Sequence, residues 1–564
     1  MQKLLLPLFL LLLATAGIAQ GSTEVGFTHD FGQRGAPGSV RARFSRLGGG
    51  LVWLQLADHY KSVVAARTQP HTTDDFMLLV LNGDDHALRL VGDEAQTHFP
   101  QDLALAEWTY RELEDGVAFS IDSGNGLVLE KILRHDPTQR GFVLEFVLRN
   151  KAAEPGGQVT FTLLGPALVN PSEVALIGTS SMAIAALPDG TEKHVGPSAG
   201  KVQTLDLDPH QISFAGNTNR FFGAFLYPSN PDSRAALTRI DVDTLPRVDT
   251  LANPDDPDSK TGANTVTRNR YGLSLAIPAR DAETRVSFGL YLGPKSYRVF
   301  ATLADPERFA PILDVDLTPP CCGGITVPGG RPMAKLLLRL LGWFHGVIGN
   351  WGLAIIMLTI LVRGLLAPLN FRMQKSMRAY GARMAVLKPK LEALKTKFGD
   401  DQKAYQQAML AFQRENKMIP PIGGCLPIFL TMPIYIGLFT ALRTAYDLRQ
   451  QSFVSWIQDL SRADALFALP FWPHEFNLLP ILWISMFVWM QLRMPLPTDP
   501  QARQMQSMMR YMPILFGLML YGYASALMVY MVTSMLWSMA ESAVVKRILG
   551  PIDPNVAAMA PTPM

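Results

Sequence analysis

Cysteine is scarce in this sequence: its 564 residues include only three, Cys321, Cys322 and Cys425. Three cysteines cannot form a disulfide scaffold, and adjacent residues such as Cys321 and Cys322 are poorly placed to bond to each other. Metal-ligand spacing is also lacking, because histidines such as His59 and His86 stand alone. No Gly-x-x-x-x-Gly-Lys-Ser/Thr pattern, which would cradle nucleotide phosphates, occurs. The sequence therefore predicts no metal and no cofactor.

An excess of charge of either sign is lacking too. The formal net charge is +3 at pH 7, which is too small to indicate a specific nucleic-acid partner. Apolar residues make up 48% of the chain but are unevenly spread. Residues 22–330 carry scattered charge, as a soluble domain does, whereas residues 331–547 carry long apolar runs. The chain is thus predicted to be multi-domain.

Residues 1–20 have the pattern of a secretory signal. One lysine precedes the apolar run Leu4–Ala19, and Gly17 and Ala19 are small enough for a cleavage site. The run is short for a membrane-spanning helix, which favours a cleaved signal peptide over a retained N-terminal anchor. Either alternative places the following domain outside the cytoplasm.

Residues 22–317 are predicted to form an all-β domain. Segments 141–150, 157–168 and 284–293 mix β-branched and aromatic residues with partial alternation, and turn-forming clusters separate them. Helical periodicity is scarce, so a large antiparallel β-sandwich is expected. Residues 318–332 are rich in proline and glycine and are predicted to be a linker.

A short amphipathic segment, 333–346, follows the linker. Lys335 and Arg339 lie four residues apart among leucine and tryptophan, which suits a helix lying in the membrane interface. The alternative is a simple extension of the helix that comes next.

Residues 347–547 contain enough apolar sequence for five membrane-spanning helices. The segments are Val347–Pro368, Leu426–Leu442, Leu478–Met494 and two that share residues 511–545, with a tight turn near Gly522–Ser525. Segment 370–418 holds 11 Lys/Arg against four Asp/Glu, so the positive-inside rule places it in the cytoplasm. Five alternating crossings then leave the β domain outside and the C-terminal tail, 548–564, in the cytoplasm.

The basic segment 371–418 is predicted to be a cytoplasmic helical hairpin, because residues 399–401 interrupt two helix-forming stretches. Its lysines include Lys388, Lys390, Lys395 and Lys397. Two interpretations stay open, a docking surface for a cytoplasmic partner and a merely solvated hairpin.

Arg363 lies inside the first predicted span, where a charged side chain is costly. It stands seven residues before Asn370, about 10 Å along a helix, so it can either snorkel toward the headgroups or face the bundle interior. No acidic residue lies mid-span in the other helices, since Glu541 is near the end of its stretch. An interior Arg363 therefore predicts a hydrated pocket, to which Thr359 one turn earlier would contribute.

Five features occur together in residues 331–547: TILVRGLLAPLN (359–370), the basic hairpin, PPIGGCLPIFLTMPIYIGLF (420–439), SFVSWIQDLS (452–461) and the Met-rich final pair of spans. Their order and spacing resemble the YidC/Oxa family of membrane protein insertases. The N-terminal domain resembles, in architecture and position, the large periplasmic supersandwich-like domain of the Gram-negative branch.

The resemblance implies a function. In this family five core helices enclose a hydrophilic groove, whose positive charge attracts the polar or acidic outer segment of a nascent membrane protein. Arg363 matches that charge, with Thr359 and Gly364 beside it. An apolar slide is implied on the second and last core spans, although ordinary helix packing is the alternative for each of its candidates: Ile428, Met432, Ile434, Phe439, Met528, Tyr530 and Met531.

The same resemblance implies the setting of the protein. We expect a multi-pass protein of the bacterial inner membrane that is not an enzyme and acts on nascent membrane proteins, alone or with the Sec translocon. Ribosomes or the signal recognition particle would deliver these clients, and membrane lipids surround the site. A solute transporter would need internal repeats and a paired ion site, and a sensor would need a cytoplasmic output domain. Neither set of features is found.

Overall fold

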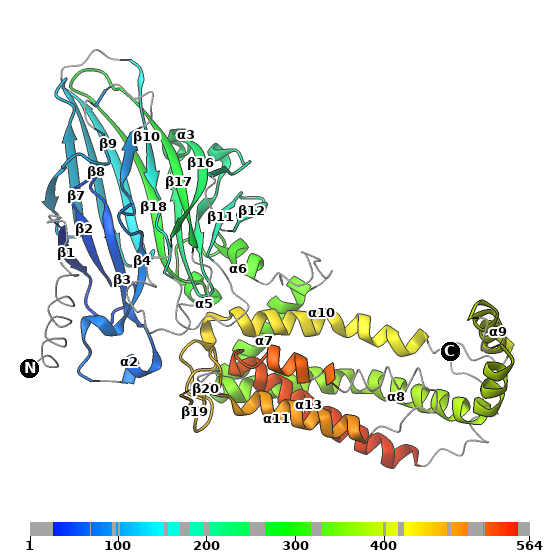
Figure 1. Cartoon of the computed structure of the whole chain (residues 1–564). Helices are drawn as coiled ribbons and strands as arrows, with labels where there is room; N and C mark the ends of the chain where they lie inside the picture. Colours follow the sequence, from blue (N-terminus) through cyan, green and yellow to red (C-terminus); the bar gives the residue numbers. More distant parts are fainter. Residues whose placement is uncertain are drawn as a thin grey trace, which may run out of the picture. The chain divides into compact units, whose positions relative to one another are not determined.

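The computed structural model describes residues 26–67, 69–92, 98–99, 102–151, 156–169, 181–196, 202–246, 265–316, 330–398, 402–415, 422–470, 475–493, 511–512 and 514–550 (Figure 1). The chain divides into two compact units, Met1–Leu313 and Asp314–Met564. The expected N-terminal signal, most of the expected linker and nearly all of the tail lie outside the described residues.

The first unit is built on a nine-stranded antiparallel sheet. Its edge-to-edge order is β12 (Glu192–Val195), β11 (Met182–Ala186), β14 (Phe214–Thr218), β15 (Phe222–Pro228), β18 (Glu283–Pro294), β9 (Gly141–Asn150), β8 (Leu127–Asp136), β7 (Gly116–Asp122) and β6 (Thr109–Glu112). The predicted strands 141–150 and 284–293 are its neighbouring central strands β9 and β18.

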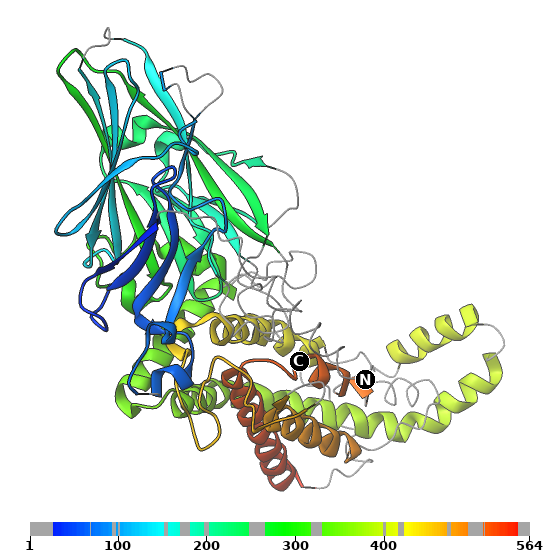
Figure 2. The same cartoon turned by 60° about the vertical axis from the view of Figure 1, so that its left-hand side comes forward.

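Two smaller antiparallel sheets accompany the large one (Figure 2). The five-stranded sheet has the order β13 (Gln203–Thr204), β16 (Leu237–Pro246), β17 (Thr265–Ala276), β10 (Gln158–Leu164) and β5 (Leu90–Gly92). The four-stranded sheet has the order β1 (Gly26–Phe31), β2 (Val40–Ser45), β3 (Leu51–Tyr60) and β4 (Phe76–Leu81). Short helices α2 (Val63–Arg67) and α3 (Pro231–Ala236) connect strands, and α5 (Tyr297–Phe300) and α6 (Ala310–Asp316) follow β18.

Aromatic side chains join the three sheets into a sandwich. Phe142 and Phe146 lie four residues apart on β9, so they point to one face of the large sheet. The Phe142 ring lies 5.2 Å from Phe31 of the four-stranded sheet, and the Phe146 ring lies 5.4 Å from Phe161 of the five-stranded sheet. Both smaller sheets therefore cover the same face, as the β-sandwich prediction requires.

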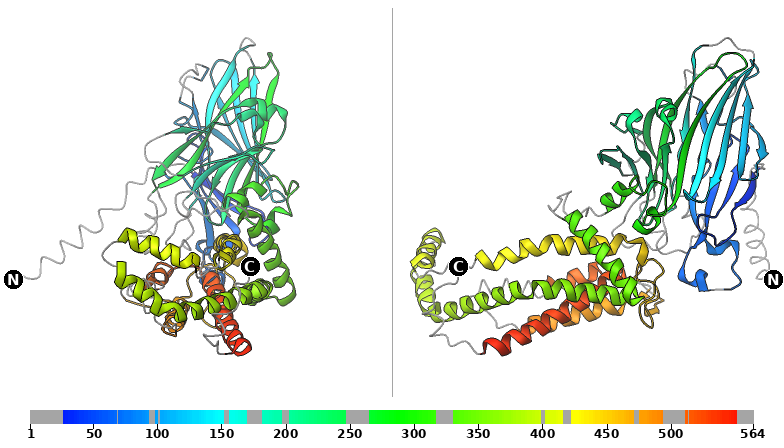
Figure 3. Two further views of the ribbon diagram at one scale, coloured as in Figure 1. Left: turned by 90° about the vertical axis from the view of Figure 1, so that its right-hand side faces the viewer. Right: turned by 180° about the vertical axis from the view of Figure 1, so that it is seen from behind.

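The second unit is helical. It contains α7 (Gly330–Ile348), α8 (Trp351–Phe398), α9 (Gln402–Glu415), α10 (Ile422–Thr444), α11 (Leu478–Leu492), α13 (Ser525–Leu549) and helical residues at 511–512 and 514–519. Two short strands, β19 (Phe467–Ala468) and β20 (Glu475–Phe476), form a hairpin before α11. Helices α8, α10 and α13 run alongside one another (Figure 3).

The helix boundaries differ from the predicted ones at two places. Gly349, with φ +74°, separates α7 from α8, so the first predicted span begins at Trp351 and not at Val347. Pro368 does not end α8, which continues to Phe398. Proline leaves the carbonyl four residues earlier without a helical donor, and that residue here is Gly364, which has no side chain to crowd the ring.

The amphipathic segment is part of α7. Its face with Ala334, Leu337 and Leu341 is buried, and it packs against α10, where a Cβ added to Gly437 would meet the Ala334 nitrogen at 3.1 Å. Trp343 lies on its exposed side, with 62% of its surface accessible. Helix α7 thus has one packed face and one face with exposed apolar groups.

Two helical stretches are long and apolar enough to cross a membrane, Trp351–Ser376 and Ser525–Leu549. Helix α11 is apolar but shorter. The described side chains of α10 begin only at Met432, and residues 494–510 and 513 fall outside the described part of the chain. The five-span arrangement therefore stays a prediction.

Candidate functional site

Arg363 lies on α8 opposite Ser534 of α13. Its Nε donates to Ser534 Oγ at 2.8 Å, and its Nη2 contacts the same oxygen. Seven residues further along both helices, Asn370 Nδ2 lies 3.5 Å from Glu541 Oε2. Because both pairs are separated by 171 residues, α8 and α13 run in the same direction and stay in register over about 10 Å.

The surroundings of the Arg363 guanidinium are polar but uncharged. Its Cζ lies 5.3 Å from the centre of the Tyr435 ring on α10, within the range of a cation–π interaction. No described Asp or Glu forms an ion pair with it, and Glu541 acts on it only through longer-range electrostatics. The positive charge is therefore positioned by a hydroxyl and an aromatic face, and no carboxylate of the described residues pairs with it directly.

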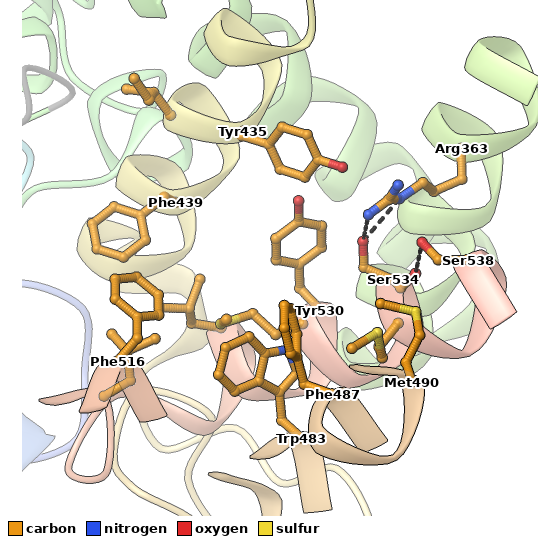
Figure 4. A pocket seen from close by; sticks show the side chains of 15 residues that line it. Arg363, Tyr435, Phe439, Trp483, Phe487, Met490, Phe516, Tyr530, Ser534 and Ser538 are labelled. Atoms are coloured by element: carbon orange, nitrogen blue, oxygen red, sulfur yellow. Dashed lines mark hydrogen bonds between the residues drawn. The ribbon is translucent and has the colours of Figure 1, made fainter. Parts of the chain in front are cut away.

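Arg363 faces a cavity of about 490 Å³ among α8, α10, α11, α13 and residues 516–520 (Figure 4). Its polar groups gather at one end, where the Tyr435 and Tyr530 hydroxyls lie near Arg363. Ser534 and Ser538 also lie at this polar end, near Arg363. The rest of the lining is apolar: Ile436, Phe439, Trp483, Phe487, Met490, Phe516, Leu520, Leu527, Met531 and Met535. The cavity is amphipathic, unlike the hydrophilic pocket expected from the sequence.

The two residues predicted to accompany Arg363 lie elsewhere. Thr359 is buried, and its hydroxyl donates to Ile355 O at 2.7 Å within its own helix, so it does not line this cavity. Gly364 lines a second cavity between α8 and α13, which shares no residue with the first.

The predicted slide residues have four different environments. Phe439, Tyr530 and Met531 line the first cavity, and Met528 is buried in the core of the helical unit. Met432 is exposed on α10 with 42% of its surface accessible, and Ile434 is half-buried. The side chain of Ile428 lies outside the described residues. Met528 thus has the packing role that was its alternative, and a slide formed by the other residues stays a prediction.

The basic segment 371–418 begins within α8 and continues into α9. Helix α8 ends at Phe398 and α9 begins at Gln402, on either side of the predicted interruption. Lys390 and Lys397 are exposed, and the side chains of Lys388 and Lys395 lie outside the described residues.

A folded loop, residues 446–464, closes one end of the helical unit. Its Leu448, Ile457 and Leu460 are buried in the same core as Leu358 of α8 and Leu442 of α10. The loop therefore fills the space between the ends of these helices.

Hydrogen bonds fix this loop to the starts of two helices. Asp464 Oδ2 accepts from the backbone N–H groups of Leu478 and Leu479 at 2.8 and 3.0 Å, which caps α11. The Ser525 hydroxyl lies 2.9 Å from Asp459 O, and Ala526 N donates to Leu460 O at 2.9 Å, which positions the start of α13. The tight turn predicted near Gly522–Ser525 precedes α13 as expected.

Sequence reasoning missed Ser534 and Tyr435 as partners of Arg363. The available signal was the pair Ser534 and Ser538, two hydroxyls one turn apart in an apolar stretch. It could not name the partner, because the pairing depends on the register between α8 and α13.

In the first unit the most unusual ionisable group is Lys131 of β8. Its side chain is fully buried, where Nζ donates to Leu88 O at 2.7 Å and contacts Gly49 O. Desolvation, followed by repulsion from Arg89, lowers the pKa of Lys131 to about 7. No group of described residues could hold a metal ion.

Comparison with known proteins gives a family match inside the helical unit and longer matches to curated relatives. A family model described as 60Kd inner membrane protein matches residues 343–551. The "Membrane protein insertase YidC" of Neisseria meningitidis serogroup C (strain 053442) is 37% identical over 275 residues, 48% of this chain and 45% of that protein. The protein of the same name from Haemophilus influenzae (strain PittEE) is 35% identical over 291 residues, 51% of this chain and 47% of its own. The matches thus span about half the length of these curated relatives.

A solved structure is also similar. "Active YidC insertase crystal structure with the first transmembrane domain resolved" has 14% sequence identity, covers 89% of this chain and 90% of its own, and has a TM-score of 0.33.

Proposed function

The helical part of the chain belongs to the YidC/Oxa family of membrane protein insertases, and from this premise we propose that the protein inserts nascent membrane proteins into the inner membrane. Such a reaction transfers polypeptide from water into lipid without making or breaking a covalent bond. It needs a site that accepts polar and apolar segments in turn.

The observation that carries the proposal is the uncompensated charge of Arg363 at the polar end of an amphipathic cavity. Ser534 and Tyr435 fix the guanidinium without cancelling its charge, and Nη1 makes no hydrogen bond to a described residue. A carboxylate of an arriving outer segment would gain a charge-assisted hydrogen bond there. A polar segment held part-way into the bilayer has less low-dielectric path left to cross.

The apolar remainder of the cavity supports the second step. Once the outer segment has moved on, the client's apolar helix needs a lipid-like surface. Phe439 and Met531 offer such a surface inside the cavity, and Met432 extends it to the outside of α10. Methionine suits this role because its flexible thioether adapts to many partner shapes.

We infer the direction of entry from the difference between the two ends of the unit. The loop at 446–464 and the buried core close one end, whereas the Arg363 cavity lies further along α8, toward the basic segment. We place the closed end on the outer side, with five spanning helices and a groove open to the cytoplasm. The β domain would then lie in the periplasm.

Partners are proposed from the same layout. The hairpin, with exposed Lys390 and Lys397, would receive clients from ribosomes or the signal recognition particle. The Sec translocon would be a partner for larger clients.

The test is insertion in cells depleted of their own insertase. Such cells receive this chain or an empty vector, and protease protection reports whether the outer segment of a short client has crossed. We expect crossing only with the chain. Failure with every client, at normal chain abundance in the membrane, would contradict the proposal.

A further inference from the structure

A second cavity, of about 470 Å³, lies between α8 and α13. From α8 it is lined by Gly364, Ala367, Pro368 and Phe371, and from α13 by Trp537, Ala540, Glu541, Val544 and Val545. Seven of these nine side chains are small or apolar, and only Trp537 and Glu541 have polar atoms. The proposed insertion pathway makes no use of this space.

The polar atoms of the cavity lack partners. Trp537 Nε1 and Glu541 Oε1 are both buried, and neither reaches hydrogen-bond geometry with a described residue. Glu541 Oε2 has only the long contact with Asn370. The Trp537 indole N–H lies close enough to the carboxyl to attract it, but outside full hydrogen-bond geometry, and Arg363 acts on the carboxyl at longer range. Buried polar atoms normally have a partner, because leaving them without one is costly. A ligand with one donor and one acceptor would satisfy both atoms.

The order of these atoms along α13 defines the ligand further. Glu541 follows Trp537 by one turn, about 6 Å, and lies nearer to Lys546 and Arg547 at the basic end of the helix. The ligand would therefore place a hydrogen-bonding cation at Glu541 and an acceptor about one turn deeper, at the Trp537 indole. The apolar wall beside Gly364 and Ala367 leaves room for a hydrocarbon chain.

We propose that this cavity binds a phospholipid with a primary ammonium headgroup, that is, a phosphatidylethanolamine. The ammonium donates to Glu541, an ester or phosphodiester oxygen accepts from Trp537, and an acyl chain lies against Gly364 and Ala367. A trimethylammonium headgroup has no N–H to donate, and an anionic headgroup is repelled by the carboxylate. The inference is independent of insertase activity, since it concerns only which lipid the helical unit retains.

The experiment is native mass spectrometry of the full chain in detergent, titrated with equimolar dioleoylphosphatidylethanolamine and dioleoylphosphatidylcholine. Wild type is expected to retain one phosphatidylethanolamine in preference to phosphatidylcholine. Glu541→Gln keeps the shape of the side chain but removes its charge, and it should weaken that preference about tenfold. Trp537→Phe should weaken it less, because the lost indole hydrogen bond is to a ligand that Glu541 still holds.

Glu475→Gln is the matched control, because Glu475 lies on β20 away from the cavity. Gly364→Leu, which fills the cavity, should abolish retention, and circular dichroism shows whether each variant is folded. Equal retention of the two lipids by wild type would overturn the proposal, as would an unchanged preference in Glu541→Gln. Better retention of dioleoylphosphatidylglycerol would overturn it too. A further result would overturn the proposal: Glu541→Gln retains the lipid as wild type does but no longer cross-links to the basic flank of a client. Glu541 would then bind protein and not lipid.

Discussion

Ser534 fixes the charge on which the proposed site depends, so its hydroxyl is the sharpest place to perturb the structure. It is the hydrogen-bond acceptor of Arg363 Nε at 2.8 Å, and only 5% of the Ser534 surface is accessible. Ser534→Ala removes that acceptor without adding bulk. The guanidinium would keep the face of Tyr435 but lose its described hydrogen bond.

The size of the effect follows from the charge of the donor. A hydrogen bond to a charged group contributes about 1.5–3 kcal/mol, so Ser534→Ala should lower the free energy of unfolding of the helical unit by about 2 kcal/mol. For a unit of this size that corresponds to a fall in Tm of roughly 4–8 °C. In an Arg363→Met background the same substitution should cost less than about 0.5 kcal/mol, because the interaction is already absent.

The assay is thermal unfolding of the purified chain in detergent, run as a double-mutant cycle. Ser538→Ala is the matched control, since that hydroxyl lines the same cavity but donates to Ser534 O at 3.0 Å within its own helix. It should change Tm little in either background. Equal costs of Ser534→Ala with and without Arg363 would refute the assignment of Ser534 as the partner.

Two further predictions concern stability. Asp464→Ala should lower the free energy of unfolding of the helical unit by about 1–3 kcal/mol, and with it the Tm, because α11 loses its cap. Asp464→Asn keeps one acceptor oxygen and should cost less. Equal Tm values for Asp464→Ala and wild type would contradict this prediction. The folded pKa of Lys131, about 7, lies below its unfolded value, so the unfolded chain holds more protons between these pKa values. The β unit should therefore become more stable as pH rises from about 7 toward 10, and Lys131→Met should flatten that slope in pH-dependent circular dichroism melts; parallel slopes would contradict it.

Much of the architecture was predictable because it rests on local patterns. Alternating β-branched and aromatic residues indicated strands such as 141–150, and the structure pairs this segment with 283–294. The interruption at 399–401 and the turn before Ser525 were visible because short polar or small-residue segments separate helix-forming ones. Each of these features is fixed by residues close together in the chain.

Some features could not be predicted because local patterns leave alternatives open. Ser534 is 171 residues from Arg363, and nothing local distinguishes it from other hydroxyls in the apolar stretches. Thr359 fits the helical spacing for a cavity residue, yet its hydroxyl is satisfied by Ile355 O. Pro368 predicted a helix end, yet α8 continues through it to Phe398. The register between α8 and α13 decided the partner of Arg363, whereas Thr359 and Pro368 were decided within α8 itself.

The most direct test of the account is the insertion rate of two matched clients, one with an acidic and one with a neutral outer segment, in cells depleted of their own insertase. The chains compared are wild type, Arg363→Lys, Arg363→Ala and the control Arg493→Ala, whose guanidinium lies over Trp489 and does not line the cavity. We predict that Arg363→Ala slows the acidic client about tenfold, with little effect on the neutral one, and that Arg363→Lys retains most of the rate because it keeps the charge. Insertion of the acidic client by Arg363→Ala at the wild-type rate would contradict the claim that this charge drives insertion.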